Sequence, residues 1–291
     1  MPISAKKHYN YVTDAWKEFM GDNFHFGYFE TEETELPAAT NALIDKMAGL
    51  CRITRSSKIL DVGCGIGEPA LYIHKKFKCA VTGISTSERG VQLAAERSGE
   101  RGCGGAVSFR VADGMNNGFP DQSFDIVWVM ESSHLMPDKK KLFRECYRVL
   151  KKSGTMVLCD IVVLEVLPFV RLAARNLPLI PKYVQLGKTW GYPNVNSMGT
   201  YCNGLIEAGF TEVTAVNITE KTLPTMRRWI QNARANGEKN VGRFTRKDVL
   251  QFIRGCEALD AFFLKGITGY GIVTANKCLL PGGRCGCYSG N

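Results

Sequence analysis

Short apolar runs alternate with amphipathic stretches from residue 57 to residue 160, and this alternation is typical of β-strand–α-helix units. From Leu142 to Leu150, apolar side chains recur three and four residues apart, which predicts a helix that Gly154 is expected to end. Chains that alternate in this way form a parallel sheet between helices. The pattern predicts five strands, at residues 58–62, 80–85, 107–112, 124–129 and 155–160.

Two more strand-like runs follow near the C-terminus, at residues 212–218 and 270–275. They bring the expected total to seven strands in an α/β fold with a doubly wound sheet. The pattern leaves open whether the last two strands form an antiparallel pair.

The remaining sequence divides around this core. Residues 1–50 look helical and are expected to form an N-terminal cap before a core of residues 51–160. Residues 161–198 interrupt the alternation with many apolar side chains, and an insertion at the carboxyl end of a parallel sheet is well placed to be a lid. An additional core helix is the alternative. Residues 199–277 complete the core, and residues 278–291 form a glycine-rich tail that we expect to be flexible.

The composition is that of a globular protein, with 45% hydrophobic and 22% charged residues among 291. No apolar run reaches the roughly 18–20 residues of a membrane span. The first residues lack the apolar segment of a signal peptide, so a cytoplasmic location is expected. Of the eleven cysteines, only Cys285 and Cys287 cluster, and no histidine accompanies them in the tail, so we expect no metal site.

The chain carries 37 basic and 28 acidic residues, a formal charge of +9. Its basic residues are spread along the sequence, and short runs of charge on a helix usually face solvent. We therefore expect no nucleic-acid partner. An RNA-associated or non-catalytic cofactor-binding protein remains the alternative class.

A glycine-rich loop follows the first predicted strand and opens a helix. It reads Asp61-Val62-Gly63-Cys64-Gly65-Ile66-Gly67. Glycines at this position let a ligand approach the backbone. Glu68, at the start of the next helix, disfavours a pyrophosphate there, whereas Asp61 suits a ligand with an ammonium group.

Several motifs, in order and at the right distances, resemble those of class I S-adenosylmethionine-dependent methyltransferases. They are the loop above, Val111-Ala112-Asp113-Gly114, the run from Phe119 to Asp125, and the run from Arg148 to Thr155. The resemblance implies a Rossmann-like fold, S-adenosyl-L-methionine as cofactor, and cofactor contacts from Asp61, Gly63 and Gly65. It also implies an adenine-binding turn at Asp113 and Gly114.

One departure from the family pattern narrows the comparison. Many such enzymes end the second strand with an acidic residue that binds the ribose, but this chain has Ser85 and Thr86 there. A branch of small-molecule methyltransferases shows a similar sequence, and a hydroxyl group still hydrogen-bonds a ribose. The substitution favours that branch.

The N-terminal segment supports the same branch. The runs from Tyr9 to Asp14 and from Asn23 to Phe29 resemble the leader of sterol, tocopherol and natural-product methyltransferases. The resemblance implies that Tyr28 reaches the methionine end of the cofactor and that Tyr11 lines the acceptor cavity. Considered alone, Tyr11 and His25 are more typical of packing residues.

Met130, Glu131 and His134 follow the fourth predicted strand, at the edge that faces the ligand crevice. Met130 and Glu131 are candidate cofactor contacts. His134 is a candidate general base, because an imidazole accepts a proton near neutral pH. Asp160, at the end of the adjacent strand, would orient His134 or act as a second base, and the pair resembles that of natural-product sugar O-methyltransferases. The alternative is that both side chains only cap local structure.

The acceptor is expected to be a lipophilic small molecule, because signatures of nucleic-acid and protein methyltransferases are missing after strand four. O-methylation of a specialised metabolite assisted by His134 and Asp160 is the leading hypothesis. C-methylation of an isoprenoid, for example a prenyl diphosphate held by lid cations, and N-methylation are alternatives. The sequence does not decide the oligomeric state, since the leader could pack on its own subunit or on a neighbour in a homo-oligomer.

Overall fold

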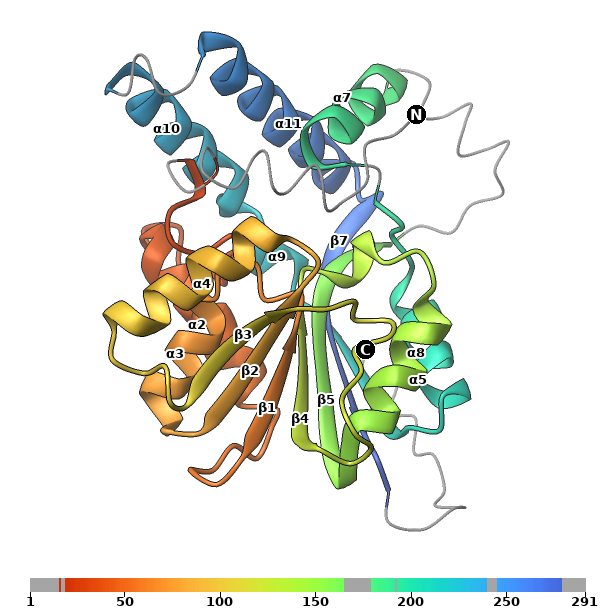
Figure 1. Ribbon diagram of the computed structural model, residues 1–291. Helices are drawn as coiled ribbons and strands as arrows, with labels where there is room; N and C mark the ends of the chain where they lie inside the picture. The colour runs from red at the N-terminus through yellow and green to blue at the C-terminus, as the bar shows by residue number, and fades with distance from the viewer. Residues whose placement is uncertain (1–15, 17–18, 165–178, 192, 240–244, 279–291) are drawn as a thin grey trace.

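A seven-stranded sheet forms the centre of the computed structural model, which describes residues 16, 19–164, 179–191, 193–239 and 245–278 (Figure 1). The strand order is β3-β2-β1-β4-β5-β7-β6. β7 alone runs antiparallel to its neighbours. The strands are β1 Lys58–Val62, β2 Ala80–Ser85, β3 Val107–Val111, β4 Phe124–Met130, β5 Leu150–Val163, β6 Thr211–Asn217 and β7 Thr268–Asn276.

The expected doubly wound sheet of seven strands is confirmed, and the last two strands are antiparallel to each other. The helix predicted at residues 142–150 is present, but the prediction that Gly154 ends it was wrong. α5 spans Lys139–Val149, and β5 starts at the next residue, Leu150, which is fully buried in an extended conformation. Gly154 lies inside β5, near a register shift in the pairing with β4. Burial of Leu150 beside Phe124 therefore ends the helix earlier than a glycine rule predicts.

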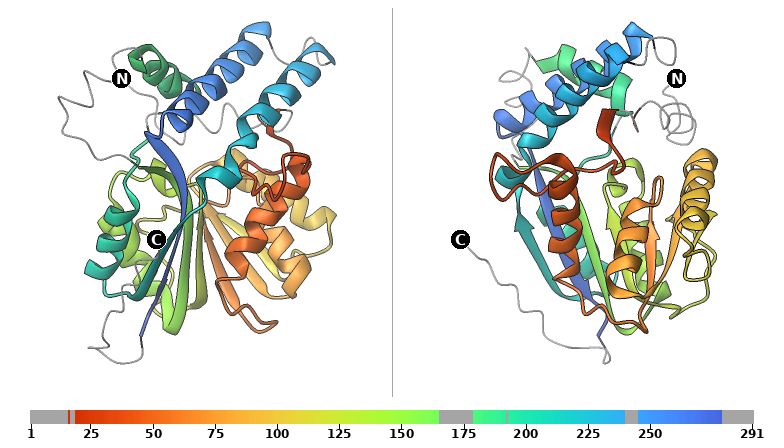
Figure 2. Two further views of the ribbon diagram at one scale, coloured as in Figure 1. Left: turned by 180° about the vertical axis from the view of Figure 1, so that it is seen from behind. Right: turned by 90° about the vertical axis from the view of Figure 1, so that its left-hand side faces the viewer.

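Helices cover both faces of the sheet (Figure 2). Alternate strand residues belong to two different hydrophobic clusters, one on each face. One face packs on α2 and α3, which span Leu36–Ala48 and Glu68–Phe77, with α4, Glu88–Glu100, beside β2 and β3. The other packs on α5 and on α8, Met198–Glu207. Each face buries its own hydrophobic cluster, so the sheet is held rigid between two cores.

A second group of helices lies beyond the carboxyl ends of the parallel strands, at the top of Figure 1. It contains α7, Ile180–Trp190, α10, Pro224–Lys239, and α11, Arg246–Leu264; the short α9, Thr219–Thr222, leads into it. α11 packs against both α7 and α10. Trp190 joins the group, with its ring 5.8 Å from that of Trp229 and 5.4 Å from that of Phe252. The predicted lid segment thus contributes α7 to a layer that α10 and α11 share.

The leader differs from the helical cap expected before residue 50. Residues 21–35 contain no helix, and α2 starts only at Leu36, with a proline in its first turn. The leader is fixed instead by long-range backbone bonds, from Phe29 N to Lys221 O (2.7 Å) and from Gly27 N to Thr225 Oγ1 (3.1 Å). These bonds hold an extended segment across the top of the sheet, which a helix would not reach.

Among the described residues, no helix is long and apolar enough to cross a membrane. Within the same part of the chain, no group of histidine, cysteine, aspartate or glutamate side chains is arranged to hold a metal ion. Cys285 and Cys287 lie outside the described residues.

Candidate active site

A cavity of about 500 Å³ opens at the carboxyl ends of β1 to β4. This is where the strand order reverses between β1 and β4, the place at which open α/β sheets bind ligands. The cavity collects nine of the ten predicted cofactor residues, namely Asp61, Gly63, Gly65, Ser85, Thr86, Asp113, Gly114, Met130 and Glu131.

The glycine loop is fixed against the neighbouring strand ends. The N–H groups of Gly63 and Cys64 both donate to the carbonyl of Ile84, at 2.8 and 3.0 Å. Gly63 has φ +86°, and a Cβ added there would lie 2.1 Å from the Cβ of Ser132. Ser132 in turn donates its hydroxyl to the carbonyl of Val62 at 2.6 Å. Only glycine permits this contact between the loops that follow β1 and β4.

Asp61 presents an unpaired carboxylate oxygen to the cavity. The residue is 1% exposed, and its Oδ2 atom has no hydrogen-bond partner. Burial raises the pKa of Asp61 to about 7. A buried acceptor without a partner is costly, so this atom fits a ligand that brings a cationic or N–H donor.

The far end of the cavity is lined by polar side chains after β2 and β3. Ser85 lines it and accepts a hydrogen bond from Ser87 N at 3.1 Å. Asp113 accepts a bond from Met115 N through Oδ1 at 2.9 Å, so its carboxylate is held in a turn at the cavity wall. Hydroxyl and carboxylate groups at these positions are suited to a ribose and to an amino group.

The leader closes one side of the cavity with residues that sequence reasoning had missed, Asp22, Phe24 and His25. His25 is buried, its Nδ1 atom lies 2.8 Å from the carbonyl of Phe26, and its Nε2 atom has no partner. Burial lowers the pKa of His25 to about 4. The ring is therefore neutral, with an unused acceptor nitrogen. The only sequence signal was its place in the leader motif.

Of the predicted site residues that the structure describes, Tyr28, His134 and Asp160 do not line this cavity. Tyr28 does not line it; the ring lies under Lys46, whose Nζ atom is 5.4 Å from the ring centroid, and its N–H donates to Ala39 O. Tyr11 lies outside the described residues.

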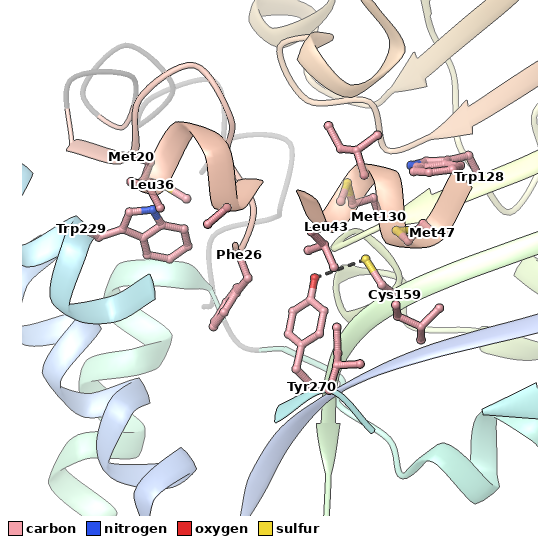
Figure 3. Close-up of a cluster of buried hydrophobic side chains, with 14 of the residues drawn as sticks. Met20, Phe26, Leu36, Leu43, Met47, Trp128, Met130, Cys159, Trp229 and Tyr270 are labelled. Carbon is pink, nitrogen blue, oxygen red and sulfur yellow. Dashed lines mark hydrogen bonds between the residues drawn. The ribbon is translucent and has the colours of Figure 1, made fainter. Parts of the chain in front are cut away.

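Glu131 joins three segments at the end of β4. Its Oε1 atom accepts hydrogen bonds from Phe26 N at 2.6 Å and from the hydroxyl of Tyr270. Figure 3 shows Phe26 of the leader, Met130 of β4 and Tyr270 of β7 around this point, with the Tyr270 hydroxyl bonded to Cys159 of β5. Glu131 itself has φ +47°, a conformation that is uncommon for a non-glycine residue. Burial raises the pKa of its carboxyl to about 8.

His134 and Asp160 form a buried pair at the ends of β4 and β5. The Nδ1 atom of His134 lies 2.7 Å from Oδ1 of Asp160, and the backbone N–H of His134 donates to Oδ2 at 2.9 Å. Ile161 N adds a bond to Oδ1 at 2.8 Å. Asp160 is completely buried, which raises its pKa, but His134 and the other donors outweigh that effect and hold the pKa below its ordinary value.

A second contact to Asp160 comes from Ser133, whose hydroxyl also donates to Oδ2. The Ser133 Oγ atom lies 2.8 Å from the hydroxyl of Tyr201 on α8. Asp160 is thus an ionised acceptor with both oxygens bonded, which suits it to orient His134 and not to collect a proton itself. A His134 ring that donates Nδ1–H to Asp160 keeps Nε2 free to accept one.

The pair is adjacent to the cavity. Ser132, Leu135 and Met136, which flank His134 in the sequence, line the cavity wall. The backbone carbonyl of His134 accepts a bond from Asn194 N at 2.7 Å, so the segment after α7 is attached to the same loop. The structure therefore brings together the cofactor candidates and, beside them, the candidate base.

Comparison with known proteins identifies the family of this chain. The family model described as "Methyltransferase domain" matches residues 60–158. The 27-O-demethylrifamycin SV methyltransferase of Amycolatopsis mediterranei is 32% identical over 282 residues, which cover 95% of this chain and 97% of that protein. The chloroplastic tocopherol O-methyltransferase of Arabidopsis thaliana is 26% identical, with 93% of this chain and 81% of that protein covered.

A solved structure has a similar fold. The cyclase SpnF superposes with a TM-score of 0.79 at 25% identity, with 94% of this chain and 96% of that chain covered. Extended likeness to the rifamycin relative, together with the sheet order and the glycine-loop cavity, establishes the family and its cofactor. The chain belongs to the class I S-adenosylmethionine-dependent methyltransferases that act on small molecules.

Proposed function

We propose that this enzyme methylates a hydroxyl group of a lipophilic specialised metabolite, with His134 as general base and Asp160 as the residue that orients it. The observation that carries the proposal is the 2.7 Å contact between His134 Nδ1 and Asp160 Oδ1 beside the cofactor cavity. An oxygen acceptor must lose a proton as it is methylated, and a correctly oriented imidazole is the side chain suited to take it.

The predicted cofactor residues suit different parts of S-adenosylmethionine. Asp61, with its unpaired Oδ2, would hold the α-ammonium group of S-adenosylmethionine. Ser85 and Thr86 would bond the ribose, and Asp113 and Gly114 the adenine, while Gly63 and Gly65 allow the close approach of the ligand. When bound, the cofactor supplies an electrophilic methyl group on a sulfonium. Met130 and Glu131, at the end of β4, also line the cavity.

The protein's own groups then have separate tasks. His134 is mostly buried, with 12% of its side chain exposed, so its free Nε2 atom takes the acceptor proton in a site with little water. Asp160 stabilises the imidazolium that forms, because it is ionised and its own bonds are already made. Alignment of acceptor and methyl group supplies the rest of the acceleration.

The layer of α7, α10 and α11 lies beyond the carboxyl edge of the sheet (Figure 1) and contains the paired aromatic residues Trp190 and Trp229, which supports a lipophilic acceptor. The rifamycin and tocopherol relatives are both named for methylation at oxygen, which supports the same choice of atom.

The cations proposed for a prenyl diphosphate give that alternative no support where they are described. Arg228 donates to Glu32 O at 2.9 Å, and Arg227 lies 4.0 Å from the Glu32 carboxylate at an exposed position. Both arginines hold the leader. Lys182 and Lys188 of α7 do not line the cofactor cavity, and Arg171 and Arg175 lie outside the described residues.

The test is a transfer assay with S-adenosylmethionine labelled on its methyl carbon, run over phenols, sugars, aliphatic alcohols, amines and prenyl diphosphates. We expect label on one class of alcohol or phenol, with a rate that depends on His134. Transfer only to an amine or to carbon contradicts oxygen methylation. If the His134→Ala variant still methylates an oxygen acceptor at the wild-type rate, His134 is not the general base.

A further inference from the structure

The ionisable side chains that line the cofactor cavity are acidic or neutral. It contains Asp22, Asp61, Asp113, Glu131 and a neutral His25, and no lysine or arginine among the described residues lines it. Asp22 is already paired, because Arg97 Nη2 lies 3.0 Å from its Oδ1. No described lysine, arginine or histidine forms an ion pair with Asp61 or Glu131. Three acids at this cavity, Asp61, Asp113 and Glu131, thus lack a cation within the described part of the protein.

Glu131 lies just after β4, between Asp113 and the His134–Asp160 pair along the edge of the sheet. The sheet order puts Asp113, after β3, at one end of the site, and the pair formed by His134, after β4, and Asp160, in β5, at the other. Asp61, in β1, also lies between them. The methyl group must face His134 for transfer to occur, so the end of β4 is the wall nearest the sulfonium.

We propose that Glu131 is the counter-charge for the sulfonium, and that it makes the cavity select S-adenosylmethionine over the product S-adenosylhomocysteine. This inference rests on the proposed function, because it takes the methyl group to face His134. Substrate and product share adenine, ribose, ammonium and carboxylate groups, and they differ at sulfur by one positive charge and one methyl group. Only a group that responds to that charge distinguishes them electrostatically.

The hydrogen bonds of Glu131 suit this task. Oε1 is occupied by Phe26 N and the Tyr270 hydroxyl, which fix the carboxyl group in place. No described residue donates to Oε2, and the side chain stays partly exposed at the cavity wall. Burial opposes ionisation until a cation arrives, so the carboxylate becomes favourable when the sulfonium is bound and unfavourable once the sulfur is neutral.

A consequence is that transfer itself weakens binding. When the methyl group leaves, the sulfur loses its charge and Glu131 is left as a partly buried carboxylate without a cation. The spent cofactor is then released more readily than the fresh one, which would limit product inhibition.

The experiment is a calorimetric titration of the full-length protein with S-adenosylmethionine and, separately, S-adenosylhomocysteine, at pH 8.5 without acceptor. The wild type is compared with Glu131→Gln, which keeps an oxygen for Phe26 N and Tyr270. Asp61→Asn is the matched control, because the ammonium that Asp61 would face is present in both ligands. Thermal unfolding of each variant verifies that it is folded, and Glu131→Asp tests whether a carboxylate alone restores selectivity.

We expect Glu131→Gln to lower the preference for S-adenosylmethionine about tenfold, and Asp61→Asn to weaken both ligands with the preference unchanged. An unchanged preference in a folded Glu131→Gln variant overturns the inference while leaving the cofactor intact. If the wild type binds neither ligand, the cofactor site fails as well, so the two failures are distinguishable.

Discussion

Two buried aspartates, on strands that flank β4, differ in their hydrogen bonds. Asp160, in β5, has both oxygens bonded by Ser133, Ile161, and the ring and backbone of His134, and its pKa is held below the ordinary value. Asp61, in β1, is equally buried but has an oxygen without a partner, and its pKa is raised to about 7. One carboxylate is complete in the free protein, and the other lacks the partner that a ligand would supply.

The difference distinguishes a group that positions from a group that binds. A carboxylate whose bonds are all internal gains nothing from a ligand, so it is free to hold a catalytic side chain in one orientation. A carboxylate with an unused oxygen destabilises the free protein and recovers that cost on binding. By this criterion Glu131, which uses only Oε1 among the described residues, belongs with Asp61.

The largest effect is expected at the base that Asp160 orients. His134→Ala should lower turnover about 10²–10⁴-fold and leave the affinity for S-adenosylhomocysteine within about twofold. Transfer assays and calorimetry measure the two quantities. His74→Ala is a control, because His74 bonds to Cys79 O on the outer side of α3 and does not line the cavity. A loss of turnover below threefold in His134→Ala would contradict a general-base role for His134.

The second largest effect is expected when the charge of Asp61 is removed. Asp61→Asn should weaken binding of S-adenosylmethionine about 10²-fold, because the ligand ammonium loses its ionic partner. Asp45→Asn, which alters an exposed acid bonded to Tyr72 and Lys76, should leave the affinity unchanged. Wild-type affinity in Asp61→Asn would show that the orphaned oxygen does not face the cofactor.

The pH dependence of stability sharpens the comparison. A carboxyl group whose pKa is raised on folding binds more protons in the folded state, so its contribution to the free energy of unfolding falls as the pH rises. Between pH 6 and pH 8, the cofactor-free wild type should therefore lose on the order of 1–2 kcal/mol relative to Asp61→Asn, since the pKa of Asp61 is about 7. Denaturant unfolding at both pH values measures this difference. A constant difference would contradict the burial of an unpaired Asp61.

The smallest effect is expected from Tyr201, which contacts the Asp160 pair through Ser133. Tyr201→Phe removes one hydroxyl of a neutral bond and should cost about 1 kcal/mol of stability, with turnover lowered about two- to fivefold. Cofactor affinity should not change. A loss of turnover as large as that of His134→Ala would mean that Tyr201 takes part in proton transfer directly.

Much of this site could be predicted from the sequence because its residues follow strand ends. The carboxyl ends of parallel strands share one edge, so locating the strands by apolar runs also located Asp61, Ser85, Asp113, Glu131 and His134. The pairing of His134 with Asp160 was predicted in the same way, from the adjacency of β4 and β5.

The remaining features depend on contacts distant in sequence. His25 reaches the cavity because the leader bonds to α9 and α10, and no local pattern encodes that path. The Glu131 contacts with Phe26 and Tyr270 span 105 and 139 residues. Likewise, the position of α10 and α11 beyond the sheet edge depends on packing with α7, which helix periodicity does not specify.

Proton release on cofactor binding tests the central claim most directly, namely that Asp61 and Glu131 are acids completed by the cofactor. S-adenosylmethionine is titrated into the wild type at pH 6.5 in buffers of different ionisation enthalpy, which gives the number of protons exchanged. With pKa values of about 7 and 8 in the free protein, both acids are largely protonated at that pH and should ionise beside the bound cations. If both acids ionise on binding, more than about one proton per site is released. Binding without proton release would contradict the claim.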